Sequence, residues 1–312
     1  MKLIHYASLA TEKPLPAARD LDRRPLSDLV ALMNGEDASV ARAVGRERAR
    51  VVQAVEMILA SFQNGGRLFL AGAGTSGRMC VLEAAECPPT FGTPPREVQA
   101  LMAGGRAAVF RSQEGAEDRG ADARRIVRRR LRRGDVLVGV AASGVTPYVR
   151  ESLAAAKTRG AKTILLTCNP LRRTPAAAGG RPGLSEGGPA ADLILAPRTG
   201  PEVLAGSTRL KAGTATKMIL NMLTTLSMVR RGKVYDRWMV DLQPRSRKLK
   251  ARAVRLVAGL GHVPERRAVR FLASAGGRVK AAILMARRRL SRREAESALA
   301  AADGFLGRAL GE

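Results

Sequence analysis

Residues 67–78 read RLFLAGAGTSGR, and this stretch decides the fold expected for the chain. The apolar run Leu68–Ala71 predicts a short strand, and the glycines after it predict a tight turn. A helix is expected over residues 79–87, ended by Pro88 and Pro89. A strand, a glycine-rich turn and a helix in succession form the first unit of a doubly wound sheet.

Four further apolar runs predict the remaining strands, at Glu97–Ala103, Asp135–Ala142, Lys162–Thr167 and Asp192–Ala196. Helices are predicted around them, at Asp37–Gln63, Gly120–Arg133, Pro147–Arg159 and Lys211–Arg231. Strands that alternate with helices predict an α/β fold, in which a doubly wound parallel sheet is flanked by helices on both faces.

Three parts of the chain are expected. Residues 51–247 form the α/β domain, residues 1–50 an N-terminal helical segment, and residues 248–312 a small helical C-terminal subdomain. The segment Leu171–Ala190 is rich in Gly, Pro, Ala and Arg, and we expect a flexible surface loop there.

Composition argues against several classes of protein. The cysteines, Cys80, Cys87 and Cys168, are odd in number and scattered, which disfavours a disulfide framework and favours a reducing compartment. No apolar run approaches the roughly 20 residues of a membrane span. The first residues carry too short an apolar stretch for a signal peptide. A cytoplasmic protein is therefore expected.

The histidines also limit the chemistry. His5 and His262 have no cysteine, histidine or acid at ligand spacing, which disfavours a zinc site and a Ser-His-acid triad. The complete dinucleotide-binding fingerprint and the Walker pattern are both absent. We therefore predict no metal and no cofactor, and expect carboxylates to transfer protons if the chain is an enzyme.

The net charge of +27 permits two interpretations. Basic patches attract nucleic acids, but aromatic residues make up only 3% of the chain, so few side chains can stack on bases. The alternative is an arginine-rich surface whose positive field gathers a small anionic ligand.

Three loops combine glycines with hydroxyl side chains next to a predicted helix start: Gly74–Gly77, Ser143–Thr146 and Gly206–Arg209. Such positions bind phosphate, because unpaired amides and the helix dipole favour an anion. Each loop alone is explained as well by helix capping. Two of them follow strands of one sheet, which favours a phosphorylated ligand.

Carboxylates lie close to the first loop in the sequence. Glu83 and Glu86 are one helical turn apart, and Glu114–Asp118 holds three more acids. Acids of this kind are usually solvated surface groups. Glu86 differs because it precedes the rigid, apolar Cys87-Pro-Pro segment, where we expect burial to raise its pKa.

Several of these segments resemble the motifs of N-acetylmuramic acid 6-phosphate etherases, a family with the SIS (sugar isomerase) fold. They are residues 34–40 (NGEDASV), 70–78 (LAGAGTSGR), 83–92 (EAAECPPTFG), 114–118 (EGAED), 141–148 (AASGVTPY), 200–214 (GPEVLAGSTRLKAGT), 220–222 (LNM) and 239–241 (MVD). Thr11-Glu12 near the N-terminus is also retained. The glucokinase regulatory protein is a related branch of the same fold.

The resemblance implies a reaction. Family members cleave the D-lactyl ether of N-acetylmuramic acid 6-phosphate in cell-wall sugar recycling, by elimination and then hydration. The products are N-acetylglucosamine 6-phosphate and D-lactate. The resemblance also suggests a homodimer, in which some pocket residues can come from the second subunit.

By motif, the family's acid corresponds to Glu86 and its second catalytic carboxylate to Glu117. The residues expected to bind the phosphate and the sugar hydroxyls are Gly74, Thr75, Ser76, Gly77, Ser143, Gly144, Thr146, Ser207 and Thr208. Lys211 is expected to offer a cation to an anionic group of the substrate.

The chain departs from the family pattern at several positions. Val145 stands where Arg is usual, Thr216 where Gln is usual, and Ser246 where Asn is expected. Asp236-Arg237-Trp238 replaces a Gly-Asn-Leu type of sequence, Glu83 replaces Asp, and Cys80 replaces Gly. Two other functions therefore stay open at this point: a sugar-phosphate sensor without turnover, and a nucleic-acid-associated protein.

Overall fold

The computed structural model describes residues 9–169 and 191–312, so the loop predicted at Leu171–Ala190 lies outside the described residues. The chain forms two compact units. The first comprises Met1–Ala84 and Arg96–Leu223, and the second comprises Ala85–Pro95 and Thr224–Glu312. These units do not test the three parts expected from the sequence, whose boundaries stay a prediction.

The first unit is built on a parallel sheet of five strands, which confirms all five predicted strands. They are β1 (Leu68–Gly72), β2 (Val98–Met102), β3 (Val136–Val140), β4 (Lys162–Leu166) and β5 (Leu193–Leu195), in the order β2-β1-β3-β4-β5. The strand β1 pairs with both β2 and β3. Neighbours that are not consecutive mark a switch point, so the segments after β1 and β3 meet at one edge of the sheet.

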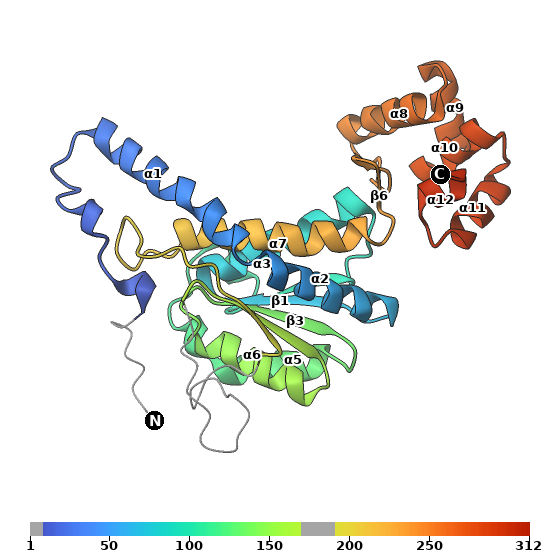
Figure 1. The fold of residues 1–312 in the computed structure, drawn as a ribbon. Helices are drawn as coiled ribbons and strands as arrows, with labels where there is room; N and C mark the ends of the chain where they lie inside the picture. The colour runs from blue at the N-terminus through green and yellow to red at the C-terminus, as the bar shows by residue number, and fades with distance from the viewer. Residues whose placement is uncertain (1–8, 170–190) are drawn as a thin grey trace. The chain divides into compact units, whose positions relative to one another are not determined.

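Helices cover both faces of this sheet, as predicted. Figure 1 shows α5 (Gly120–Arg130) and α6 (Pro147–Thr158) on one face, and α2 (Arg48–Gln63) and α7 (Lys211–Val229) on the other. The remaining helices that begin in this unit are α1 (Leu26–Gly45), α3 (Gly74–Phe91) and α4 (Ala107–Phe110), with 3₁₀ turns at Ala10–Glu12, Pro16–Ala18 and Ala116–Asp118.

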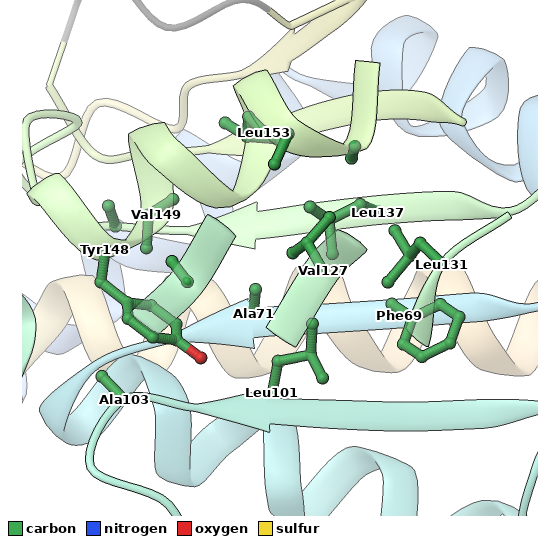
Figure 2. Close-up of a cluster of buried hydrophobic side chains, with 14 of the residues drawn as sticks. Phe69, Ala71, Leu101, Ala103, Val127, Leu131, Leu137, Tyr148, Val149 and Leu153 are labelled. Atoms are coloured by element: carbon green, nitrogen blue, oxygen red, sulfur yellow. The ribbon is translucent and has the colours of Figure 1, made fainter. Parts of the chain in front are cut away.

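A buried cluster joins the sheet to α5 and α6 (Figure 2). Phe69 of β1 and Leu137 of β3 are fully buried against side chains of these helices, such as Val127. The ring of Tyr148 lies in the same cluster. Its hydroxyl has no hydrogen-bond partner among the described residues, and burial raises its pKa to about 12.

Two helices differ from the prediction. The helix predicted at Asp37–Gln63 is interrupted between α1 and α2, where the buried Glu47 accepts a hydrogen bond from Ala196 N (3.1 Å) after β5. The apolar period continues on both sides of this break, so the sequence does not reveal it. The helix α3 begins at Gly74 and continues through Pro88 and Pro89, because Gly92 N still bonds to Pro88 O (3.0 Å).

The second unit is helical apart from a short hairpin, as predicted for the C-terminal region. The hairpin pairs β6 (Val234–Tyr235) with β7 (Trp238–Met239). The helices are α8 (Arg247–Gly261), α9 (Glu265–Ser274), α10 (Val279–Arg288), α11 (Arg292–Ala301) and α12 (Leu306–Leu310). Among the described residues of the whole chain, no helix is long and apolar enough to cross a membrane.

Alanine substitutions at two glycines should change the unfolding free energy in opposite directions. A Cβ on Gly139 of β3 would lie 2.8 Å from Val149 Cγ1 and 3.0 Å from Leu153 Cγ, so Gly139→Ala should cost about 1–3 kcal/mol of unfolding free energy. A Cβ on the exposed Gly35 of α1 meets nothing within 4 Å, so Gly35→Ala should add about 0.5–1 kcal/mol. Urea denaturation followed by circular dichroism measures both, and equal shifts would contradict this packing.

Candidate active site

A cavity of about 330 Å³ opens in the first unit at the carboxyl ends of β1 and β3. Its apolar wall comes from strand ends such as Val140–Ala142. Its polar lining residues are Glu12, Thr75, Ser76, Arg78, Ser112, Gln113, Glu114, Glu117, Ser143, Thr146 and Thr208. The cavity therefore combines many hydroxyls with a few charges, and it lies at the switch point where α/β sheets bind ligands.

Contact between two glycines positions the loop after β1. A Cβ on Gly72 would lie 2.7 Å from Gly77 N, and a Cβ on Gly77 would lie 2.6 Å from Gly72 O. Gly74, which also lines the cavity, has a φ of +52°, where side chains are disfavoured. The backbone can therefore turn sharply, and the first turn of α3 brings Thr75 and Ser76 to the cavity. Gly77, predicted to bind ligand, lies outside the lining and has a packing role.

The loop after β3 is a tight turn in which the hydroxyls of Ser143 and Thr146 lie 3.5 Å apart, within hydrogen-bond distance of each other. Gly144 N donates to Ala141 O (2.8 Å), and Gly144 has a φ of +77°. Gly144 lies outside the lining, while Ser143 and Thr146 contribute to it. Thr146 is the N-cap residue of α6, yet its side chain makes no capping bond. The capping alternative left open by the sequence therefore does not account for this hydroxyl.

The third loop contributes less than predicted. Thr208 lines the cavity, whereas Ser207 does not. The first amides of α7 are not available to an anion, because the fully buried Glu202 accepts hydrogen bonds from Lys211 N (3.0 Å) and Ala212 N (2.9 Å). The carboxylate of the same chain thus occupies the position where a phosphate was expected.

Lys211 forms an ion pair within the chain. Its side chain is buried, lies outside the cavity lining, and donates from Nζ to the carboxylate of Glu36. A contact between Lys211 and an anionic group of the substrate therefore stays a prediction. The cation among the described lining residues is Arg78, whose Nε also donates to Val109 O (2.9 Å).

The two predicted catalytic carboxylates have different surroundings. Glu117 lies on the 3₁₀ turn Ala116–Asp118 and lines the cavity together with Glu114. Its side chain is exposed, and its carboxylate has no hydrogen bond or ion pair within the described part of the chain. Glu114 Oε1 instead accepts a hydrogen bond from Ser112 Oγ (2.9 Å).

Glu86 lies on the part of α3 that belongs to the second unit, and it is not a lining residue of this cavity. Its side chain is exposed, so the expected burial was wrong. The helical period gives the reason, because Cys80, Glu83 and Cys87 form the buried face of α3 and leave Glu86 off it. The buried acid is Glu83, whose Oε2 accepts a hydrogen bond from Lys217 Nζ (2.9 Å).

Sequence reasoning missed two charged lining residues, Glu12 and Arg78. Arg78 ends the glycine-rich run of residues 67–78, and its position after Gly77 was an available signal. No spacing connects Glu12 with this run, because the two segments meet only after the chain has folded. Only the retained Thr11-Glu12 pair pointed to the N-terminus.

The departures from the family pattern leave the hydroxyl lining intact. Val145 lies outside the lining, and its backbone N donates to Ser143 Oγ (3.3 Å). Thr216 and Cys80 are buried. Ser246 caps α8 by accepting a hydrogen bond from Leu249 N (3.2 Å), a role that Asn fulfils equally well. Arg237 is exposed in the hairpin of the second unit.

This fold and its cavity define an SIS-type α/β protein. The N-terminal SIS domain of the glucokinase regulatory protein matches residues 50–157. A phosphoheptose isomerase from Francisella tularensis has the same fold, with a TM-score of 0.50 and 16% identity, over 66% of this chain and all of that one.

Two curated relatives identify the branch. An N-acetylmuramic acid 6-phosphate etherase from Picosynechococcus sp. is 45% identical, over 97% of this chain and 96% of its own. Another, from Symbiobacterium thermophilum, is 46% identical over 88% of both chains. The chain belongs to the N-acetylmuramic acid 6-phosphate etherase family, as its motifs indicated.

Substitutions in the Lys211–Glu36 pair test whether Lys211 stabilises the fold or binds the ligand. Lys211→Met leaves the partly buried carboxylate of Glu36 without its cation, and we expect it to lower the unfolding free energy by about 2 kcal/mol. Adding Glu36→Gln should restore part of this loss. Affinity for inorganic phosphate, measured by calorimetry, should stay within about twofold of wild type. Unchanged stability with lost phosphate affinity would show that Lys211 is a ligand after all.

Proposed function

We propose that this protein cleaves the D-lactyl ether of N-acetylmuramic acid 6-phosphate, giving N-acetylglucosamine 6-phosphate and D-lactate. The observation that carries the proposal is the hydroxyl-lined cavity at the switch point of the sheet, in a chain 45% identical over 97% of its length to a curated etherase. The three further features below support it.

The first supporting feature is the chemistry of the cavity at the ends of β1 and β3. Thr75, Ser76, Ser143 and Thr146 provide hydroxyl donors, and the first turn of α3 provides backbone amides. Arg78 adds a cation. Hydroxyls, helix amides and a guanidinium together suit a phosphate, because each donates hydrogen bonds and two of them bring positive charge. We assign the 6-phosphate of the substrate to this group.

The second feature is a carboxylate placed to act as a base. In the open-chain form of the sugar, the C1 aldehyde acidifies the proton on C2. Glu117 removes this proton, and its carboxylate is suited to the task because no partner among the described residues competes for it. The electrons released at C2 form a C2–C3 double bond as the C3–O bond breaks and lactate departs.

The leaving group needs an acid, because an alkoxide departs poorly without a proton. We assign this step to Glu86, which protonates the ether oxygen and then removes a proton from the water that adds to C3. The assignment rests on the family motif at residues 83–92, since Glu86 does not line the cavity of the first unit. As the hydroxyl adds to C3, Glu117 returns its proton to C2, so Glu117 ends as a carboxylate and Glu86 as an acid, and the cycle requires no metal or cofactor.

The third feature concerns the cellular compartment, which the cysteines indicate. Cys80, Cys87 and Cys168 are buried and form no disulfide, which fits a cytoplasmic enzyme of cell-wall sugar recycling. Burial raises the pKa of Cys168 to about 12, so this thiol is inert.

We also propose a homodimer. Sedimentation should then give twice the chain mass of 33.2 kDa, and the monomer mass would count against it.

The reaction is tested by D-lactate release from N-acetylmuramic acid 6-phosphate. Wild-type protein should release lactate, and Glu86→Gln or Glu117→Gln should lower the rate by about 100-fold or more, because each loses a proton-transfer group. Glu56→Gln on the exposed face of α2 is the matched control, since it removes the same charge at a residue outside the cavity lining and should keep the wild-type rate.

The outcomes of this assay distinguish an etherase from a sensor and test the role given to each glutamate. A folded wild-type protein that binds the sugar phosphate and releases no lactate would refute the etherase assignment and favour a sensor. Lactate release by wild type that persists in Glu86→Gln or Glu117→Gln would keep the reaction but remove that residue from the mechanism.

A further inference from the structure

We propose that Glu12 is a substrate-contacting residue of the same cavity, where its carboxylate accepts hydrogen bonds from hydroxyl groups of the sugar. The inference rests on the proposed function and extends it to the N-terminal segment. Glu12 lies more than fifty residues before β1, yet it shares the cavity with Thr75, Ser143 and Thr208.

The backbone next to Glu12 is held in place by a buried side chain. Thr11 N donates to Asn169 Oδ1 (3.3 Å), and Asn169 Nδ2 donates to Thr11 Oγ1 (3.0 Å). Thr11 and Asn169 are both buried. Asn169 Nδ2 also donates to Ala142 O (3.0 Å), one residue before Ser143. The N-terminal segment is therefore attached to the loop after β3 that lines the cavity.

A second attachment comes from the loop before α7. Gly206 N donates to Thr11 O (3.2 Å), and a Cβ on Gly206 would lie 3.1 Å from Glu12 Oε2. Gly206 has a φ of +77°, which also disfavours a side chain. The carboxylate of Glu12 is thus packed against the backbone of the loop that contributes Thr208, and a glycine leaves the room it needs.

The Glu12 side chain is exposed at the cavity, next to a backbone segment that hydrogen bonds hold in place. Glu12 has no hydrogen bond or ion pair within residues 9–169 and 191–312, although its neighbour Thr11 is fixed from three directions. It adds a negative charge to a cavity already lined by Glu114 and Glu117. This charge works against binding of a phosphate, so electrostatic attraction to that group does not explain it.

Hydroxyl groups of the sugar explain why the carboxylate of Glu12 lines this cavity. An ionised carboxylate is an acceptor only, and its two oxygens can receive hydrogen bonds from two hydroxyl donors. Hydrogen bonds of this kind, to a charged acceptor, are among the stronger ones in proteins. The cavity then has two subsites. Hydroxyls, amides and Arg78 bind the phosphate, and Glu12 binds the sugar.

The test compares Glu12→Gln with the matched control Glu56→Gln in the lactate-release assay, with inorganic phosphate as a competitive inhibitor. Loss of a charged acceptor should raise KM for N-acetylmuramic acid 6-phosphate by about tenfold or more. The inhibition constant of phosphate should stay unchanged or fall slightly, because a negative charge has been removed. Glu12→Asp keeps the charge and should recover part of the lost affinity.

Two results would overturn the inference. One is a KM for Glu12→Gln within about twofold of wild type, which corresponds to less than about 0.5 kcal/mol. The other is an equal rise in KM and in the phosphate inhibition constant, which would mean that the variant disturbs the whole cavity. Circular dichroism of Glu12→Gln excludes unfolding as the cause.

A binding experiment distinguishes failure of the proposed reaction from failure of the role given to Glu12. If wild type releases no lactate, binding of N-acetylglucosamine 6-phosphate and of inorganic phosphate is measured by calorimetry in wild type and Glu12→Gln. Selective loss of the sugar phosphate in the variant would retain Glu12 as a sugar ligand on a protein of another activity. Equal binding of both ligands by the two proteins would reject it.

Discussion

The close backbone contact between Gly72 and Gly77 is the constraint on which the site depends. A side chain at either position would place a Cβ within 2.7 Å of the other segment, so the end of β1 and the first turn of α3 meet without side chains between them. This contact brings Thr75 and Ser76 to the edge where β3 ends. The order of the strands adds Ser143 from the neighbouring loop. The contact between the two glycines and the strand order at the switch point together produce a cavity rich in hydrogen-bond donors.

The charges around this cavity are arranged so that its own carboxylates stay available. Glu202 and Glu83 are buried and bound by groups of the chain, the former by the α7 amides and the latter by Lys217. Glu12 and Glu117 have no such partners among the described residues and face the cavity. The chain as a whole carries a charge of +27, and a field of that sign favours the approach of an anionic sugar phosphate even to a site that contains acids.

The fold was predictable because its signals are local. All five strands are mostly apolar runs, and the loops after β1 and β3 have a recognisable composition. What failed depended on contacts between distant segments or on the exact face of a helix. Lys211 was expected to be free, but Glu36 lies 175 residues away in sequence. Glu86 was expected to be buried, but the helical phase of α3 buries Glu83. The position of Glu12 depends on the bond between its neighbour Thr11 and Asn169, 158 residues after Thr11, and no pattern near either residue shows that they meet.

Conversion of N-acetylmuramic acid 6-phosphate in oxygen-18 water tests the central claim most directly. Elimination breaks the C3–O bond, so lactate departs with the ether oxygen and the new hydroxyl on C3 comes from water. The account predicts label at C3 of N-acetylglucosamine 6-phosphate, located by the isotope shift of the C3 carbon resonance, and unlabelled lactate. Label in lactate would show that water attacks the lactyl carbon, which would contradict the elimination and the roles given to Glu86 and Glu117.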